Sequence, residues 1–139
     1  MTAQTSRSSG RARAFPNIDF LDSLRPTRMK LGLENISKLL QRLGSPQSAY
    51  PSILVAGTNG KGSVCAYITS ILQAGGLRVG TFFSPHLFRI NERIRLDMDE
   101  IPSERLDELL GRLRKESKQA PFTYFEGMTA AAALHFRQE

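Results

Sequence analysis

An apolar run, a glycine-rich turn carrying one lysine and a helical pattern follow one another over residues 53–63. Residues 53–56 predict a buried parallel strand, and the glycines after it let the backbone turn sharply and approach a ligand with no Cβ in the way. A helix that begins near Ser63 adds unsatisfied amides, and Lys61 adds a full positive charge. This combination favours binding of a polyphosphate anion. The residues expected to form the cradle are Gly57, Thr58, Asn59, Gly60, Lys61, Gly62 and Ser63.

The spacing of this loop departs from the standard phosphate-binding pattern, G-x-x-x-x-G-K-[ST]. Val55 stands where the first glycine would fall, and Gly62 separates Lys61 from Ser63. In the standard loop the hydroxyl directly after the lysine reaches Mg²⁺, and one further residue along a helix turns the side chain by about 100°. Ser63 is therefore not expected to hold the metal. The alternative interpretation of the loop is a plain glycine turn between a strand and a helix.

The composition of the 139-residue chain limits its class. With 40% apolar residues it can form one modest core, and it is too short for two full domains. The formal net charge is +6, of which residues 1–30 carry +4 and the rest +2. No aromatic-interleaved basic stripe and no zinc-finger spacing accompanies this charge, which argues against nucleic-acid binding. The single cysteine fits a cytoplasmic protein, and no apolar run is long enough to predict a membrane span.

Two regions are expected along the chain. Residues 1–17 are polar and basic and predict a disordered tail, with an organellar transit peptide as the alternative. Residues 18–139 carry the periodic patterns of an ordered domain. Helices are predicted over residues 18–24, 33–43 and 63–75, and the second of these is expected to pack against the sheet. Two more helices are predicted to begin at an N-cap, Ser103, and at a capping box formed by Thr123 and Glu126.

The strand pattern predicts a nucleotide site at one sheet edge. Residues 78–83 form a second predicted strand, which would complete a right-handed β-α-β unit with residues 53–56. The sequence Ser84-Pro-His-Leu87 would then leave the sheet at the carboxyl edge, beside the phosphates. Residues 94–100 predict a small hairpin.

Several polar residues have competing interpretations. Cys65 has no base beside it in the sequence and is expected to be a small buried hydrophobe rather than a nucleophile. His86 has no second histidine or cysteine at ligand spacing, so a structural role in its loop is favoured. His135 lies on an alanine-rich helix and is expected at the surface or in the core. Residues 91–93 fit contacts to the phosphates and surface ion pairs equally well.

Five motifs in this order resemble the ATP-binding start of folylpolyglutamate synthases, including their bifunctional dihydrofolate synthase form, in the Mur ligase superfamily. The resemblance covers about residues 20–139. Its motifs are Lys30-Leu-Gly-Leu-Glu34, Gly57-Thr-Asn-Gly-Lys-Gly-Ser63, Ser84-Pro-His-Leu87, Asn91-Glu-Arg-Ile-Arg95 and Thr123-Tyr-Phe-Glu126.

The resemblance implies an α/β fold, with a P-loop-type parallel sheet flanked by helices, and ATP and Mg²⁺ as cofactors. The implied reaction joins L-glutamate to dihydropteroate or a folyl(poly)glutamate through an acyl phosphate. Lys61 would be catalytic and stabilise developing charge, and Ser84 would hold the metal. The residues that would contact the pteroate are Ser23, Leu24, Arg25, Pro26, Thr123, Tyr124, Phe125 and Glu126.

One feature of such an enzyme is not found in the sequence. A Mg-nucleotide enzyme needs an acid at the end of an apolar strand, and no apolar run after Phe83 ends in one. Residues 18–139 are therefore expected to be the N-terminal part of a truncated ligase domain that is inactive alone, and the full-length protein is expected to be a monomer. The alternatives are another Mur-type amide ligase and a non-catalytic nucleotide-binding module.

Overall fold

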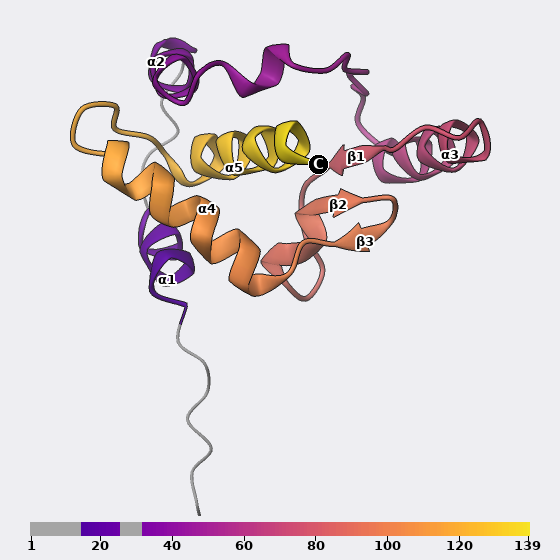
Figure 1. The fold of residues 1–139 in the computed structure, drawn as a ribbon. Helices are drawn as coiled ribbons and strands as arrows, with labels where there is room; N and C mark the ends of the chain where they lie inside the picture. Colours follow the sequence, from indigo (N-terminus) through magenta and orange to yellow (C-terminus); the bar gives the residue numbers. More distant parts are fainter. Residues whose placement is uncertain (1–14, 26–31) are drawn as a thin grey trace, which may run out of the picture.

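The computed structural model of the chain describes residues 15–25 and 32–139. Figure 1 shows α1, α2 and α4 gathered around α5, with a small sheet beside them. The elements are α1 (Pro16–Ser23), α2 (Glu34–Arg42), η1 (Pro46–Ser48), α3 (Lys61–Ala74), β1 (Gly80–Phe82), η2 (Ile90–Arg93), β2 (Ile94–Leu96), β3 (Asp99–Glu100), α4 (Ser103–Glu116) and α5 (Tyr124–Gln138). Within these ranges no helix is both long and apolar enough to cross a membrane.

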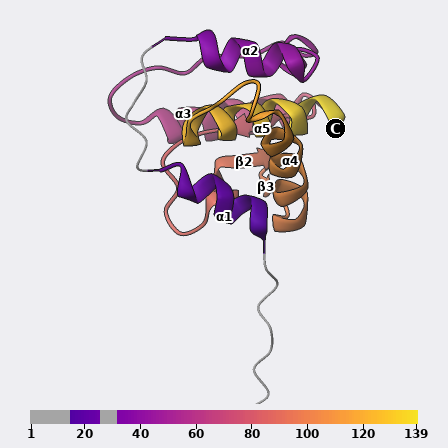
Figure 2. The same ribbon diagram turned by 90° about the vertical axis from the view of Figure 1, so that its left-hand side faces the viewer.

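The core of the molecule is helical, and α5 runs through its middle. Figures 1 and 2 both show α2 on one side of α5 and α4 with α1 on the other. Four leucines of α4, spaced as one helix face requires, are almost fully buried: Leu106, Leu109, Leu110 and Leu113. The predicted helix is thus confirmed, as is α2, which ends before Gly44. The prediction that α2 packs against the sheet is wrong, because its apolar face meets α5 and α4 instead.

The sheet is small and antiparallel. Its order is β1-β2-β3, with Thr81 opposite Arg95 and Leu96 opposite Asp99. The turn between β2 and β3 has positive φ at both central residues, Asp97 (50°) and Met98 (76°). Positive φ at both positions matches the twist of a two-residue hairpin. The predicted hairpin over residues 94–100 is therefore confirmed.

The strand predicted at residues 53–56 is not formed within the described part of the chain. These residues are in no sheet, and the side chains of Ile53 and Leu54 are 65% and 92% exposed. A parallel strand needs a bonded neighbour and a helix over each face. Here β1 bonds β2 antiparallel, and its other edge is not paired with residues 53–56. The expected parallel β-α-β pairing is accordingly absent from the described residues.

Helix α3 lies apart from the other helices, at the far right of Figure 1. Its contact with the sheet includes a hydrogen bond of 2.9 Å between the hydroxyls of Thr69 and Thr81. Two large side chains of its predicted apolar face, Tyr67 and Ile71, are exposed, and Cys65 is half-buried rather than buried as predicted. The apolar pattern of α3 is that of a covered helix, but the described residues do not cover it.

Polar side chains fix the ends of the packed helices. The carboxylate of Asp107 accepts hydrogen bonds from the backbone N–H of Asn17 (2.8 Å) and Ile18 (3.1 Å) and from the Asn17 side chain (2.9 Å), which ties the start of α1 to α4. Much of the tail predicted at residues 1–17 lies outside the described residues, and α1 begins at Pro16.

The two predicted helix caps have different outcomes. Pro102 is the N-cap of α4, so the prediction that Ser103 caps it is wrong; the Ser103 hydroxyl instead lies 3.2 Å from the side-chain amide of Asn91. The capping box at the start of α5 is confirmed: the N–H of Thr123 donates to the Glu126 carboxylate at 2.8 Å, and the N–H of Glu126 lies 3.4 Å from the Thr123 hydroxyl.

Candidate functional site

The glycine-rich loop is held open at the start of α3. Gly60 is the N-cap of this helix with φ of 76°, and Gly57 has φ of 144°. Such values are strained for residues with a side chain, so glycine is required at both places. A Cβ added at Gly57, Gly60 or Gly62 would meet nothing within 4 Å, so the loop faces open space. No side chain of the described residues caps the helix, so its first amides are available to a ligand.

Lys61 is folded over its own loop. Its ammonium group donates to the backbone carbonyls of Gly57 (2.7 Å) and Thr58 (3.1 Å). Within the described part of the chain its charge is not paired with a carboxylate. A lysine held in this way places its positive charge over the cradle and beside the N-terminus of α3. The geometry is that of a site for an anion with several phosphate oxygens.

The two serines considered for the metal are both exposed. Ser63 is the third residue of α3, and Ser84 lies in the loop after β1, followed by a cis peptide bond to Pro85. The hydrogen bond between the Thr69 and Thr81 hydroxyls holds α3 against β1, and Ser84 leaves the carboxyl end of that strand. In the described ranges, no three His, Cys, Asp or Glu side chains are grouped closely enough to hold a metal ion. The role of Ser84 therefore stays a prediction.

The structure brings together the two segments expected to contact the pteroate. The Arg25 guanidinium lies 4.6 Å from the centre of the Tyr124 ring, and it donates a hydrogen bond of 3.2 Å to the Tyr124 hydroxyl. Phe125 is about half exposed beside Phe82, with ring centres 5.9 Å apart. Leu24 is half-buried and packs against the core. The Ser23 hydroxyl donates to a carbonyl of its own helix.

Side chains of the second segment expected to contact the pteroate, residues 123–126, also stabilise the start of α5. One residue of the first segment, residues 23–26, is not described. Thr123 and Glu126 bond each other's backbone in the capping box. Burial raises the pKa of Tyr124, and the two nearby arginines oppose that shift. Pro26 lies outside the described residues. If both segments contact one pteroate, α1 and α5 must lie side by side here, and they do. The sequence supported the assignment of the first segment only through its spacing from a later motif.

The prediction for residues 91–93 is wrong as far as surface ion pairs are concerned, because all three are buried. The Glu92 carboxylate accepts hydrogen bonds from the backbone N–H groups of Leu87, Phe88 and Arg89 at 2.6–2.7 Å. These bonds hold the pKa of Glu92 below its usual value. Asn91 donates to the carbonyl of Ile101 at 2.7 Å. Both residues therefore shape the loop after β1.

Arg93 and His86 form a hydrogen-bonded pair that no sequence signal identified. The Arg93 Nε–H donates to His86 Nδ1 at 2.7 Å. The acceptor nitrogen must be unprotonated, so the imidazole is neutral and its proton is on Nε2. Burial, and then the charges of Arg93 and Arg25, lower the pKa of His86. The structural role predicted for His86 is confirmed, and its partner comes from the end of η2.

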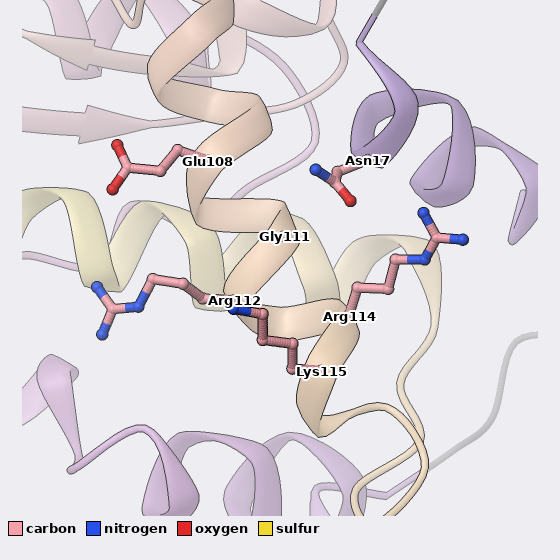
Figure 3. A pocket seen from close by; sticks show the side chains of 6 residues that line it. All are labelled: Asn17, Glu108, Gly111, Arg112, Arg114 and Lys115. Carbon is pink, nitrogen blue, oxygen red and sulfur yellow. The ribbon is translucent and has the colours of Figure 1, made fainter.

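Two further features lie away from the loop. His135 is buried in α5, which is the core alternative of its prediction, and its Nδ1 has no hydrogen-bond partner among residues 15–25 and 32–139. An open hollow of about 630 Å³ lies along α4. Figure 3 shows that Arg112 and Arg114 point to opposite sides of this helix. The hollow is lined by Asn17, Glu108, Gly111, Arg112, Arg114 and Lys115. None of the predicted site residues lines this hollow.

Comparison with known proteins gives consistent relatives. No protein-family model matches the chain. A dihydrofolate synthetase of Saccharomyces cerevisiae is 39% identical over 110 residues, which cover 78% of this chain and 26% of the yeast protein. A solved structure of Escherichia coli FolC in complex with DHPP and ADP has a TM-score of 0.80 and 36% identity, covering 88% of this chain and 30% of that one.

A third relative shows the same overlap. The crystal structure of the bifunctional folylpolyglutamate synthase/dihydrofolate synthase of Yersinia pestis, complexed with AMPPNP and Mn ion, has a TM-score of 0.78 and 36% identity, over 87% of this chain and 30% of that one. The chain spans 26–30% of the length of these three proteins. The agreement confirms the α/β fold class and the resemblance stated from the motifs. The chain is a homologue of the folylpolyglutamate and dihydrofolate synthases and corresponds to less than a third of their length.

Proposed function

We propose that this chain contributes the phosphate-binding part of an ATP-dependent ligase that joins L-glutamate to dihydropteroate or to a folyl(poly)glutamate. The observation that carries the proposal is the loop at the start of α3, where Lys61 lies over the carbonyls of Gly57 and Thr58 beside unbonded helix amides. Its homologues include a structure with DHPP and ADP and one with AMPPNP and Mn ion. These ligands match the ATP, divalent-metal and pteroate sites inferred for this chain.

In the proposed reaction, a carboxylate oxygen of the acceptor attacks the γ-phosphorus of ATP. The bond from that phosphorus to the β–γ bridging oxygen breaks, so ADP leaves and an acyl phosphate forms. The amino group of L-glutamate then attacks the acyl carbon, inorganic phosphate leaves, and the amine loses a proton as the amide forms. Charge builds on the transferred phosphoryl group and on the leaving oxygen of ADP. The Lys61 ammonium and the amides at the start of α3 would stabilise it.

The residues present fit a nucleotide with Mg²⁺. The loop offers N–H donors with open space in front of its glycines, and Ser84 offers a hard hydroxyl oxygen. Mg²⁺ usually keeps several waters and phosphate oxygens, so one protein hydroxyl is an adequate ligand. When bound, the ion would neutralise phosphate charge. The contact of Arg25 with Tyr124 would hold the two pteroate segments in place around the acceptor.

We place residues 18–139 in the ATP-binding domain of such a ligase, and we propose that the full-length protein is a monomer in the cytoplasm with small-molecule partners. Calorimetric titration of the chain with MgADP tests the phosphate site. The Lys61→Ala variant should lose affinity by about tenfold or more, since hydrogen bonds to charged groups contribute about 1.5–3 kcal/mol. Lys118→Ala, which changes an exposed lysine in the turn after α4, is the matched control and should bind like the unaltered chain. Equal affinities for both variants would contradict the proposal.

A further inference from the structure

Arg93 is a buried charge whose surroundings are unusual. Arg93 is 8% exposed. Within the described part of the chain, no carboxylate forms an ion pair with its guanidinium. The neighbouring Glu92 is bonded to three backbone N–H groups, and Asp22 pairs with Arg25 at 2.8 Å. Removing an arginine from water without a paired anion is unfavourable. The part of the guanidinium that stays accessible is therefore where an anion would stabilise this charge.

The guanidinium is fixed from two sides. Its Nε–H donates to His86 Nδ1 at 2.7 Å, and its Cζ lies 5.7 Å from the centre of the Tyr124 ring. The ring of Tyr124 also carries Arg25, whose Cζ is 4.6 Å from the centre. Two guanidiniums thus contact one aromatic ring at the start of α5. This arrangement orients Arg93 before any ligand binds.

The ends of the guanidinium remain free. Among the described residues, the one hydrogen bond of the Arg93 side chain is made by Nε, so both terminal amino groups keep their donors. In the described ranges, the buried side-chain atoms that lack a partner are Arg95 Nε and His135 Nδ1, so neither terminal amino group of Arg93 is one of them. The terminal amino groups are therefore the part of Arg93 that solvent or a ligand can reach. A planar pair of such donors matches the oxygens of a carboxylate or a phosphate.

We propose that the terminal amino groups of Arg93 bind an oxyanion, with His86 and Tyr124 acting as positioning residues. The inference deepens the proposed function and rests on it for the source of the anion, which is either the carboxylate of the acceptor or a phosphate of the nucleotide. Arg93 contacts the ring of Tyr124, in the predicted pteroate segment. The backbone carbonyl of Arg93 accepts a hydrogen bond of 3.1 Å from the N–H of Phe83, the residue before Ser84, the predicted metal ligand. His86 supports the site through its Nδ1, which accepts the Arg93 Nε–H at 2.7 Å.

Titration of the unaltered chain followed by NMR tests this without a variant. Inorganic phosphate, p-aminobenzoylglutamate and MgADP are added separately while the Arg93 Nε–H signal and the amides of residues 57–63 are observed. The Arg93 signal should shift with at least one probe. A shift with inorganic phosphate or MgADP identifies a nucleotide phosphate as the source of the anion, and a shift with p-aminobenzoylglutamate identifies the acceptor carboxylate. If the loop amides shift with MgADP while Arg93 responds to no probe, the inference is overturned and the nucleotide site stands. If Arg93 shifts and the loop does not, the inference stands and the proposed function fails.

Variants give a second measurement. Arg93→Gln keeps an N–H for His86 and loses the terminal pair, so affinity for the responding probe should fall by about tenfold or more. Arg95→Gln is the matched control, because Arg95 also contacts an aromatic ring, Phe83 at 5.3 Å, but already faces Glu100 at 3.6 Å. His86→Asn retains an acceptor in place of Nδ1 and should bind better than His86→Ala. Equal binding by Arg93→Gln and Arg95→Gln, both with melting curves like that of the unaltered chain, would overturn the inference.

Discussion

The hydrogen bonds of Asp107 explain how a short helix stays in place and keeps Arg25 beside Tyr124. Helix α1 has eight residues, too few to persist alone in water. Its first N–H groups are bonded by the Asp107 carboxylate, at 2.8 Å from Asn17 and 3.1 Å from Ile18. A third bond joins the carboxylate to the Asn17 side chain at 2.9 Å. We predict that Asp107→Ala weakens the attachment of the start of α1 to α4, while Leu21, which is fully buried, stays in the core.

The magnitude follows from these bonds. Losing the two backbone bonds resembles losing a helix N-cap, which costs about 1 kcal/mol. The bond between the carboxylate and the Asn17 amide adds about 1.5 kcal/mol, reduced somewhat because Asp107 is only half-buried. A destabilisation of about 2 kcal/mol is expected, and for a chain of this size each 1 kcal/mol lowers Tm by about 4 °C. Asp107→Ala should therefore melt about 8 °C lower.

The matched control is the next residue. Glu108 is exposed and pairs with Arg105 one turn away at 2.7 Å, so Glu108→Ala should change the free energy of unfolding by less than about 0.5 kcal/mol. Circular dichroism melts of both variants measure the difference. Asp107→Asn should fall between them, since its amide oxygen can still accept from the helix N–H groups but its NH₂ faces another donor. Melts of Asp107→Ala and Glu108→Ala that coincide would refute this account of α1.

Three further predictions concern the metal, pH and the uncovered helix. Ser84→Ala should raise the Mg²⁺ concentration needed for ATP binding more than Ser63→Ala does, as measured by calorimetry across a Mg²⁺ series; the opposite order would assign the metal to Ser63. Burial lowers the pKa of His135, so the unfolded chain binds a proton at a higher pH than the folded chain does. The contribution of His135 to stability should be complete above the unfolded pKa of about 6.5 and should fall as the pH decreases below it. Urea titrations at several pH values should show a shallower fall in the free energy of unfolding for His135→Leu. An unchanged slope would contradict this. Ile71→Lys should leave Tm within about 2 °C and reduce binding of an apolar dye, because Ile71 is exposed, and a large fall in Tm would show that its face is covered.

Helix patterns predicted the core well because each depends on residues a few positions apart. The spacing of the α4 leucines and the capping box of Thr123 and Glu126 specify burial and a helix start from local sequence alone. The hairpin at residues 94–100 was predictable for the same reason. The N-cap of α4 is Pro102 and not Ser103. A local pattern locates the start of a helix only to within one or two residues.

The sheet was less predictable because strand pairing depends on distant partners. Residues 53–56 have the composition of a buried strand, but composition does not supply a neighbour, and β1 pairs with β2 instead. The pair of Arg93 and His86 has the same cause: nothing at either position marks the other, although both lie in motifs that carry the family resemblance. The motifs located the site, and the fold determined which side chains meet there.

The two halves of the proposed site differ in how firmly they are held. The acceptor half is built on α1 and α5, and Leu21 and Met128 of these helices belong to the same buried cluster. The phosphate half is built on α3, whose Tyr67 and Ile71 are exposed and whose link to the sheet includes the Thr69–Thr81 hydrogen bond. Segments with few buried apolar contacts open most readily. The phosphate half is therefore expected to open more readily than the residues around Tyr124. Binding of a nucleotide should reduce this opening, because a ligand that binds the closed loop stabilises it.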